Sequence, residues 1–187
     1  MKTAPRTIMI LRHAEKPNET DSHQLPCGVD EDGQAQPTSL IPRGWQRAGA
    51  LAAMFGTVTL PSPFVRPTLL LAPAYADGLM HRPGETITPL ARKLKLQIQE
   101  PVPKGQEAAL VSDTLLKQTG QDVLICWEHH HIPAIVTALV SALGVTTTPP
   151  NGLLWPDHDF HSVLIFAGQP NGEYVLTQTS MGLLDGD

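Results

Sequence analysis

Short apolar runs of strand length alternate along this chain with segments in which apolar residues recur every three or four positions. Apolar runs that are not interrupted by polar residues are typical of strands buried on both faces, whereas the three-to-four spacing is typical of amphipathic helices. The uninterrupted runs predict strands over residues 6–11, 68–72 and 123–127, and alternation of apolar and polar residues predicts a short strand over residues 96–99. It predicts helices over residues 42–55, 87–94, 106–118 and 133–143.

Prolines and two long polar segments mark the boundaries of these elements. Pro89 is ambiguous, because it either kinks a helix that already contains Ile87 or marks the start of a shorter helix with Thr88 as its N-cap. Residues 17–41 and 145–161 have little periodicity and are expected to be loops. Loops of this length are uncommon inside a compact domain unless they serve a site.

The order of these elements predicts an α/β fold. Strands that alternate with helices favour a mostly parallel central sheet with helices on both faces, which is a three-layer α/β/α sandwich. A hairpin over residues 163–167 and 174–177 is expected to add antiparallel strands, and the whole chain, residues 1–187, fits one domain. In such folds the site lies at the carboxyl ends of the strands. The polar residues expected there are Arg12, His13, Arg82 and the run from Glu128 to His131.

Composition and charge exclude several classes of protein. The formal net charge is −5 and the 13 Lys and Arg residues are spread over the chain, which leaves no basic face for nucleic acid. The longest apolar stretch, residues 132–145, is shorter than the ~20 residues of a membrane-spanning helix. Cys27 and Cys126 have no metal or disulfide spacing and are expected to be reduced thiols. We therefore expect a soluble, cytoplasmic protein with no nucleic-acid or membrane partner.

The polar residues at the carboxyl end of the expected sheet suit a phosphoryl group. Two arginines offer forked donors that match phosphate oxygens, and helix amino termini after Arg82 and His131 add backbone N–H groups. Neighbouring cations keep a histidine unprotonated near neutral pH, so a nitrogen of His13 is available to attack phosphorus. A second, protonated histidine from residues 128–131 would stabilise charge on the phosphoryl oxygens during transfer.

Four segments resemble, in the same order, the motifs of the histidine phosphatase superfamily, which is also called phosphoglycerate mutase-like. The matching segments are Arg12 to Ala14, residues 40–48, Arg82 with residues 85–91, and residues 123–130. The first resembles the Arg-His-Gly signature of the family, and the second its Leu-Thr-x-x-Gly-x-x-Gln-Ala segment, which opens the first helix. The third resembles a second phosphate-binding arginine followed by a Thr-Ala-x-x-Leu-Ala pattern. The fourth resembles the last strand of the family with its His-Gly or His-Asp motif.

The resemblance implies a role for each matching residue. His13 is expected to be the phosphorylated nucleophile, Arg12 and Arg82 to bind the phosphoryl oxygens, and His129 to be the second histidine of the pocket. Lys16, followed by Pro17, occupies the place of the Arg-x-Pro segment in the acid-phosphatase branch, which makes Lys16 a candidate for a further phosphate contact. Neither a metal nor an organic cofactor is implied.

Two positions depart from the family pattern. Ala14 replaces the usual Gly, and its methyl group is expected to crowd the backbone beside the phosphate. His130 stands where the family has Gly or a proton-donating Asp, so the acid that protonates the leaving group stays open, with His130 and Glu15 ranked first. The four candidates are Glu15, Asp77, Glu128 and His130.

The expected function is that of a phosphohydrolase of the histidine phosphatase type. It would act on a phosphomonoester or on phosphohistidine through a covalent phosphohistidine intermediate on His13. Its partner would be a small phosphorylated substrate or a phosphohistidine protein. Mutase activity is disfavoured, because the long insertion and the obvious acidic donor of the family's sugar-phosphate mutases are missing.

Two other functions stay open at this stage. A catalytically weak member of the same fold would only bind phosphate or a phosphoprotein, and Ala14 together with the unidentified acid keeps this alternative open. A non-enzymatic metal-binding module would use the His129–His131 cluster with Glu128, His158 and His161. Consecutive histidines in a turn point in different directions, which disfavours the metal-binding module.

Overall fold

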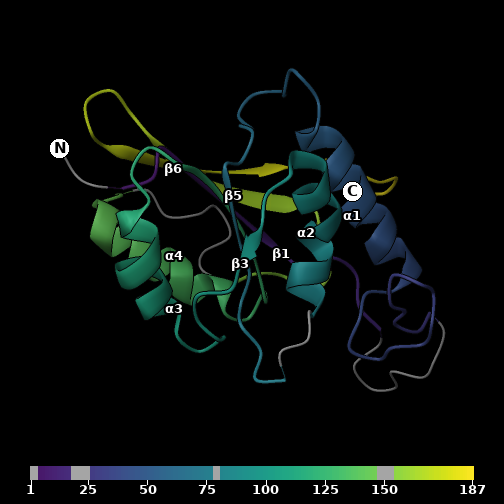
Figure 1. Ribbon diagram of the computed structural model, residues 1–187. Helices are drawn as coiled ribbons and strands as arrows, with labels where there is room; N and C mark the ends of the chain where they lie inside the picture. The colour runs from purple at the N-terminus through teal and green to yellow at the C-terminus, as the bar shows by residue number, and fades with distance from the viewer. Residues whose placement is uncertain (1–3, 18–25, 78–80, 147–153) are drawn as a thin grey trace.

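A six-stranded sheet forms the centre of the computed structural model, which describes residues 4–17, 26–77, 81–146 and 154–187 (Figure 1). The order of the strands across the sheet is β3-β2-β4-β1-β5-β6. Their bounds are β1 Thr7–Arg12, β2 Leu69–Leu71, β3 Ile98–Gln99, β4 Asp122–Trp127, β5 Ser162–Gly168 and β6 Tyr174–Ser180.

The centre of the sheet is parallel and one edge is antiparallel. Strands β1, β2, β3 and β4 pair in parallel, whereas β5 pairs antiparallel with both β1 and β6. Central β1 pairs with β4 from Thr7 opposite Asp122 to Arg12 opposite Trp127, so both strands end at the same level. The N–H of His13 continues this ladder by donating to the carbonyl of Trp127 at 3.0 Å. This register brings His13 beside the residues that follow β4.

Helices cover both faces of the sheet, as the sequence pattern predicts. Helices α1 (Pro42–Phe55) and α2 (Arg82–Leu94) lie on one side, and α3 (Glu107–Ala109) and α4 (Ile132–Leu143) lie on the other (Figure 1). Successive residues of β1 point to opposite faces, and both faces are buried. Met9 and Leu11 pack in the core shared with α1 and α2, whereas Ile8 and Ile10 pack in the core shared with α4. The three-layer α/β/α architecture with a mostly parallel sheet is therefore confirmed.

Two of the predicted helices differ in detail from the expectation. Helix α2 begins at Arg82 and passes through Pro89, so the reading with a Thr88 N-cap is wrong. The hydroxyl of Thr88 instead donates to the carbonyl of Gly84 at 2.9 Å inside the helix. The helix predicted over residues 106–118 is α3 followed by a π-helical turn, Leu110–Thr114, and a 3₁₀ turn, Leu115–Lys117.

None of the helices in the described parts of the chain combines the length and the apolar character needed to cross a membrane.

Candidate active site

A cavity of about 360 Å³ lies where the loops that follow β1, β2, β3 and β4 meet. Its walls carry both nucleophilic and cationic side chains, together with one carboxylate. The lining residues are His13, Lys16, Thr38, Tyr75, His81, Arg82, Pro83, Lys104, Glu128, His129 and His130. Six of the residues singled out in the sequence thus share one cavity, namely His13, Lys16, Arg82, Glu128, His129 and His130.

His13 is a buried, neutral histidine with a defined tautomer. Its Nδ1 lies 2.7 Å from the carbonyl of Ala14, and because a carbonyl only accepts, Nδ1 carries the proton. Nε2 is then the ring nitrogen with a lone pair. Burial, followed by the charges of Arg12, Arg82 and Lys16, lowers the pKa of His13 well below 6.5. His13 therefore has the electronic state of a nucleophile at neutral pH.

The loop that carries His13 is tied to the first turn of α2. The N–H of Ala14 donates to the hydroxyl oxygen of Thr86 at 2.9 Å, and that hydroxyl donates to the carbonyl of Arg82 at 2.7 Å. Arg82 is the first residue of α2, so its side chain enters the cavity at a helix amino terminus, where the helix dipole favours an anion. Its guanidinium also donates to the carbonyls of Pro37 at 3.0 Å and Ser39 at 3.3 Å.

His129 is paired with a carboxylate from the loop before β5. Its Nε2 donates to Oδ1 of Asp157 at 3.0 Å, and its ring meets the ring of His13 edge-on, with centroids 6.0 Å apart. Burial and the charge of Arg12 lower the pKa of His129 to about 4, against the opposing effect of Asp157. The ring is therefore neutral at pH 7. A phosphate dianion beside it would raise its pKa and favour the imidazolium.

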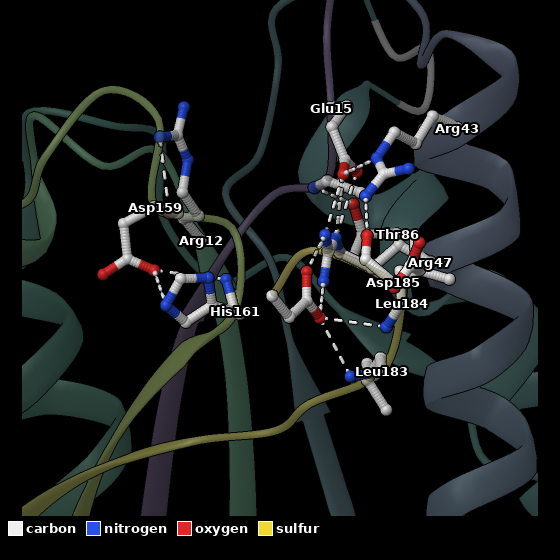
Figure 2. Close-up of polar contacts among 12 residues, drawn as sticks. Arg12, Glu15, Arg43, Arg47, Thr86, Asp159, His161, Leu183, Leu184 and Asp185 are labelled. Carbon is white, nitrogen blue, oxygen red and sulfur yellow. Dashed lines mark hydrogen bonds and ion pairs between the residues drawn. The ribbon is translucent and has the colours of Figure 1, made fainter.

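Arg12 is buried next to this pair. Its Nη1 donates to the carbonyls of Asp157 at 2.6 Å, Pro156 at 3.2 Å and Asp159 at 3.4 Å, and its guanidinium lies 3.9 Å from the centre of the Phe160 ring. Figure 2 shows the guanidinium of Arg12 turned away from the cluster around Glu15. Arg12 is not among the residues that line the cavity. Burial lowers its pKa to about 10, at which it stays charged at neutral pH.

Within the described residues, three buried side-chain nitrogens have no hydrogen-bond partner: Nε and Nη2 of Arg12 and Nδ1 of His129. Buried polar atoms without a partner are rare in folded proteins, and each calls for an explanation such as a missing ligand. The two residues belong to the expected phosphate site, where an anion with several oxygens would accept from both nitrogens of Arg12 and, once the His129 ring is protonated, from its Nδ1.

Solved structures with a similar fold identify the fold of this chain. Phosphoserine phosphatase from Entamoeba histolytica, in complex with 3-phosphoglyceric acid, matches with a TM-score of 0.57 at 12% identity over 95% of this chain and 99% of that one. Phosphoglycerate mutase from Bacillus anthracis matches with a TM-score of 0.53 at 11% identity over 95% of this chain and 94% of that one. These proteins share the histidine phosphatase superfamily fold. This chain has the histidine phosphatase fold.

A third structure agrees with the other two. SixA from Agrobacterium tumefaciens, described as a phosphohistidine phosphatase, matches with a TM-score of 0.52 at 16% identity over 95% of this chain and 99% of that one. No family model and no curated protein sequence matches the chain. At identities of 11–16% these comparisons show the fold alone.

Beyond the expected residues, the histidine phosphatase fold of this chain places a polar cluster at the cavity. Glu128 accepts hydrogen bonds from Tyr75 at 2.9 Å and from Lys104 at 3.0 Å, and the ring of Tyr75 stacks on His81 at 3.9 Å. Burial raises the pKa of Glu128, but the hydrogen bonds from Lys104 and Tyr75 outweigh it and lower the pKa below its usual value. Glu128 is therefore a carboxylate at neutral pH. Tyr75 and Lys104 were missed in the sequence, although both follow predicted strands.

Two of the candidate acids lie outside the cavity lining. The carboxylate of Glu15 is bound by Arg47 at 2.8 Å and Arg43 at 3.3 Å (Figure 2). Asp77 pairs with His81 at 2.8 Å. Ala14 also differs from the expectation, because its buried methyl group packs in a cluster with Leu40 and Ala48 and not in the cavity.

The histidine cluster is divided between two sides of the turn after β4. His131 pairs with Glu107 at 3.1 Å, whereas His129 and His130 line the cavity. Among the described residues, one group of three has ligand atoms within 4.8 Å of one another, namely His129, His130 and Asp157. It includes neither His131 nor His158, so it is not the cluster expected from the sequence.

Proposed function

We propose that this protein is a phosphohydrolase that cleaves a phosphomonoester or phosphohistidine through a covalent phosphohistidine intermediate on His13. The observation that carries the proposal is the set of unpartnered buried nitrogens on Arg12 and His129, next to a neutral histidine nucleophile. A phosphoryl group is the simplest ligand with enough acceptor oxygens for these donors. The phosphatases among the structural neighbours support the same reaction.

In the proposed first step, Nε2 of His13 attacks phosphorus and the bond from phosphorus to the leaving atom breaks. The leaving atom is an oxygen in a phosphomonoester and an imidazole nitrogen in phosphohistidine. Arg82 and Lys16 bind the phosphoryl oxygens from the cavity wall. Arg12, which does not line the cavity, contributes its unpartnered Nε and Nη2. Nδ1 of His129, protonated once the dianion is bound, donates to an equatorial oxygen. These charges stabilise the transferring group while its negative charge spreads over three oxygens.

His130 is the proposed acid for the leaving group. It lines the cavity and its ring lies 3.9 Å from that of His129. Glu128 lines the cavity too, but as a carboxylate already bound by Lys104 it lacks a proton to give. In the second step neutral His130 takes a proton from water, the water oxygen attacks phosphorus, and the phosphorus–nitrogen bond breaks to release phosphate and restore His13.

The substrate is proposed to be small. The cavity volume of about 360 Å³ must hold both the phosphoryl group and the leaving group. The names of two neighbours, phosphoserine phosphatase and phosphohistidine phosphatase, fit the two substrate classes in the proposal.

Hydrolysis of 4-nitrophenyl phosphate by wild type, His13→Ala and His158→Ala tests the proposal. We expect His13→Ala to lose at least about 10³-fold in kcat. His158, an exposed residue of the loop before β5 that does not line the cavity, serves as the control and should keep wild-type activity. Rapid quenching with a ³²P-labelled substrate should trap an acid-labile phosphoprotein in wild type only.

Full activity of His13→Ala would contradict the nucleophile assignment. Tight vanadate binding by a wild-type protein that hydrolyses nothing would instead support the alternative in which the fold only binds phosphate.

A further inference from the structure

Asp157 touches both of the residues that carry the unpartnered nitrogens. Its carboxylate accepts from Nε2 of His129 at 3.0 Å, and its main-chain carbonyl accepts from Nη1 of Arg12 at 2.6 Å. We infer that Asp157 is a positioning residue, which turns Nδ1 of His129 and the Nε edge of Arg12 toward a bound phosphoryl group. The inference rests on the proposed function and deepens it.

The contact with His129 fixes which ring nitrogen is left for the ligand. A carboxylate only accepts, so Nε2 must carry a proton and Nδ1 is the nitrogen without a partner. Without Asp157 the ring would be free to turn about its side-chain bonds or to change tautomer. A carboxylate that holds the far nitrogen of a functional histidine in this way sets the orientation and the tautomer of the ring.

The contact with Arg12 likewise fixes the orientation of a side chain. Three carbonyls between Pro156 and Asp159 accept from one nitrogen of the guanidinium, Nη1, and the ring of Phe160 lies against its face. The guanidinium is planar, so holding one nitrogen and one face also fixes the direction of Nε and Nη2. Those two atoms are the ones left without partners.

The loop that carries Asp157 is anchored independently of its side chain. The carboxylate of Asp159 accepts from the N–H groups of His161 at 3.2 Å and Ser162 at 2.9 Å, and Trp155 donates to the carbonyl of Asp159 at 2.8 Å. The side chain of Asp157, by contrast, is 82% exposed. Its replacement should therefore leave the fold and the loop in place, which makes the positioning role separable from stability.

Charge also favours a carboxylate at this point. The ring of His129 is faced by the cations of Arg12 and Lys16 and by the rings of His13 and His130. Asp157 places an acceptor on the remaining nitrogen among these groups. An amide can supply the same hydrogen bond without the charge, so Asp157→Asn separates orientation from charge.

The test compares Asp157→Ala, Asp157→Asn and the loop control His158→Ala for vanadate affinity by calorimetry and for hydrolysis of 4-nitrophenyl phosphate. We expect Asp157→Ala to weaken vanadate binding and kcat/KM by about 10- to 100-fold. Asp157→Asn should keep vanadate affinity and kcat/KM within about fivefold of wild type, because it keeps the hydrogen-bond acceptor. The melting temperatures of all three variants should stay within about 2 °C of wild type.

A double-mutant cycle with His129→Ala tests whether Asp157 acts on the ligand through His129. If Asp157 acts through His129, Asp157→Ala should change vanadate affinity less than about twofold in the His129→Ala background. An equal loss in both backgrounds, or no loss in the wild-type background, overturns the positioning role. A wild type that binds vanadate but hydrolyses nothing refutes the phosphatase proposal alone, and the vanadate affinities still decide on Asp157. A wild type that binds no vanadate overturns both.

Discussion

Glu15, which lies two residues after His13 on the nucleophile loop, forms a buried ion pair with Arg47 of α1. The side chains are 10% and 5% exposed, and Nη2 of Arg47 lies 2.8 Å from Oε1 of Glu15. Arg47 also binds the carboxylate of Asp187 at 2.7 Å. The ion pair depends on a close approach of α1 to this loop, which Gly44 permits. A Cβ atom at position 44 would lie only 2.5 Å from the carbonyl oxygen of Glu15. Glu15 thus fixes the loop to α1 instead of lining the cavity.

Replacing Arg47 should destabilise the protein strongly. Arg47→Met removes the buried cation from the carboxylates of Asp187 and Glu15 and leaves Glu15 with the half-exposed Arg43, and loss of one member of a buried ion pair costs about 3–5 kcal/mol. Arg43→Met is the matched control, since Arg43 binds the same Glu15 but is 48% exposed, and it should cost about 1 kcal/mol or less. Urea unfolding at neutral pH measures both, and equal losses in the two variants would show that the pair is not the stabilising contact.

Restoring glycine at position 14 should not improve catalysis. The methyl group of Ala14 is fully buried in the cluster with Leu40 and Ala48, and its N–H is bound to Thr86. Ala14→Gly should therefore lose about 1 kcal/mol of stability through the lost packing and the added backbone freedom. The rate of 4-nitrophenyl phosphate hydrolysis should not rise.

Ala48→Gly is the control for this substitution. It removes a methyl group from the same cluster but belongs to α1 and not to the nucleophile loop. Comparable losses of stability with unchanged rates are expected for both variants. A several-fold faster rate in Ala14→Gly alone would restore the view that the alanine crowds the phosphate.

Most of the fold follows from local patterns in the sequence. The runs at Ile8 to Leu11 and Val123 to Trp127 predicted buried strands of a mostly parallel sheet. The structure pairs these two strands in parallel as neighbours, which brings His13 and His129 to the same end of the sheet. Pro89 was the exception, since a helix that gains its stability from packing tolerates an internal proline that local preference alone would exclude.

The site was less predictable, because side-chain direction depends on residues distant in sequence. The spacing of Glu15 from His13 does not reveal Arg47, whose contact decides that Glu15 faces α1. Asp157 lies in a segment without periodicity, so its place beside His129 depends on how the loop before β5 folds. Tyr75 and Lys104 could have been found by the rule that residues after parallel strands gather at one edge.

Removal of metal ions should leave hydrolysis unchanged. The proposed transfer uses cationic side chains and His13, and no step needs a metal ion. Dialysis against EDTA followed by the 4-nitrophenyl phosphate assay checks this. If EDTA abolishes activity and zinc restores it in wild type, and calorimetry shows that His130→Ala no longer binds zinc, the group of His129, His130 and Asp157 would be a functional metal site.

Lowering the pH should destabilise the protein through His13. Its pKa in the folded state lies well below 6.5, the value expected in the unfolded chain, so below pH 6.5 the unfolded state binds more protons. The stability contributed by neutral His13 is therefore complete above about pH 6.5 and is lost as the pH falls. One such group is expected to cost on the order of 1 kcal/mol between pH 7 and pH 5.5. Urea unfolding at these two values should show a smaller drop, by about this amount, in His13→Gln than in wild type. His158→Gln should match wild type, and an undiminished drop in His13→Gln would mean that folding does not lower the pKa of His13.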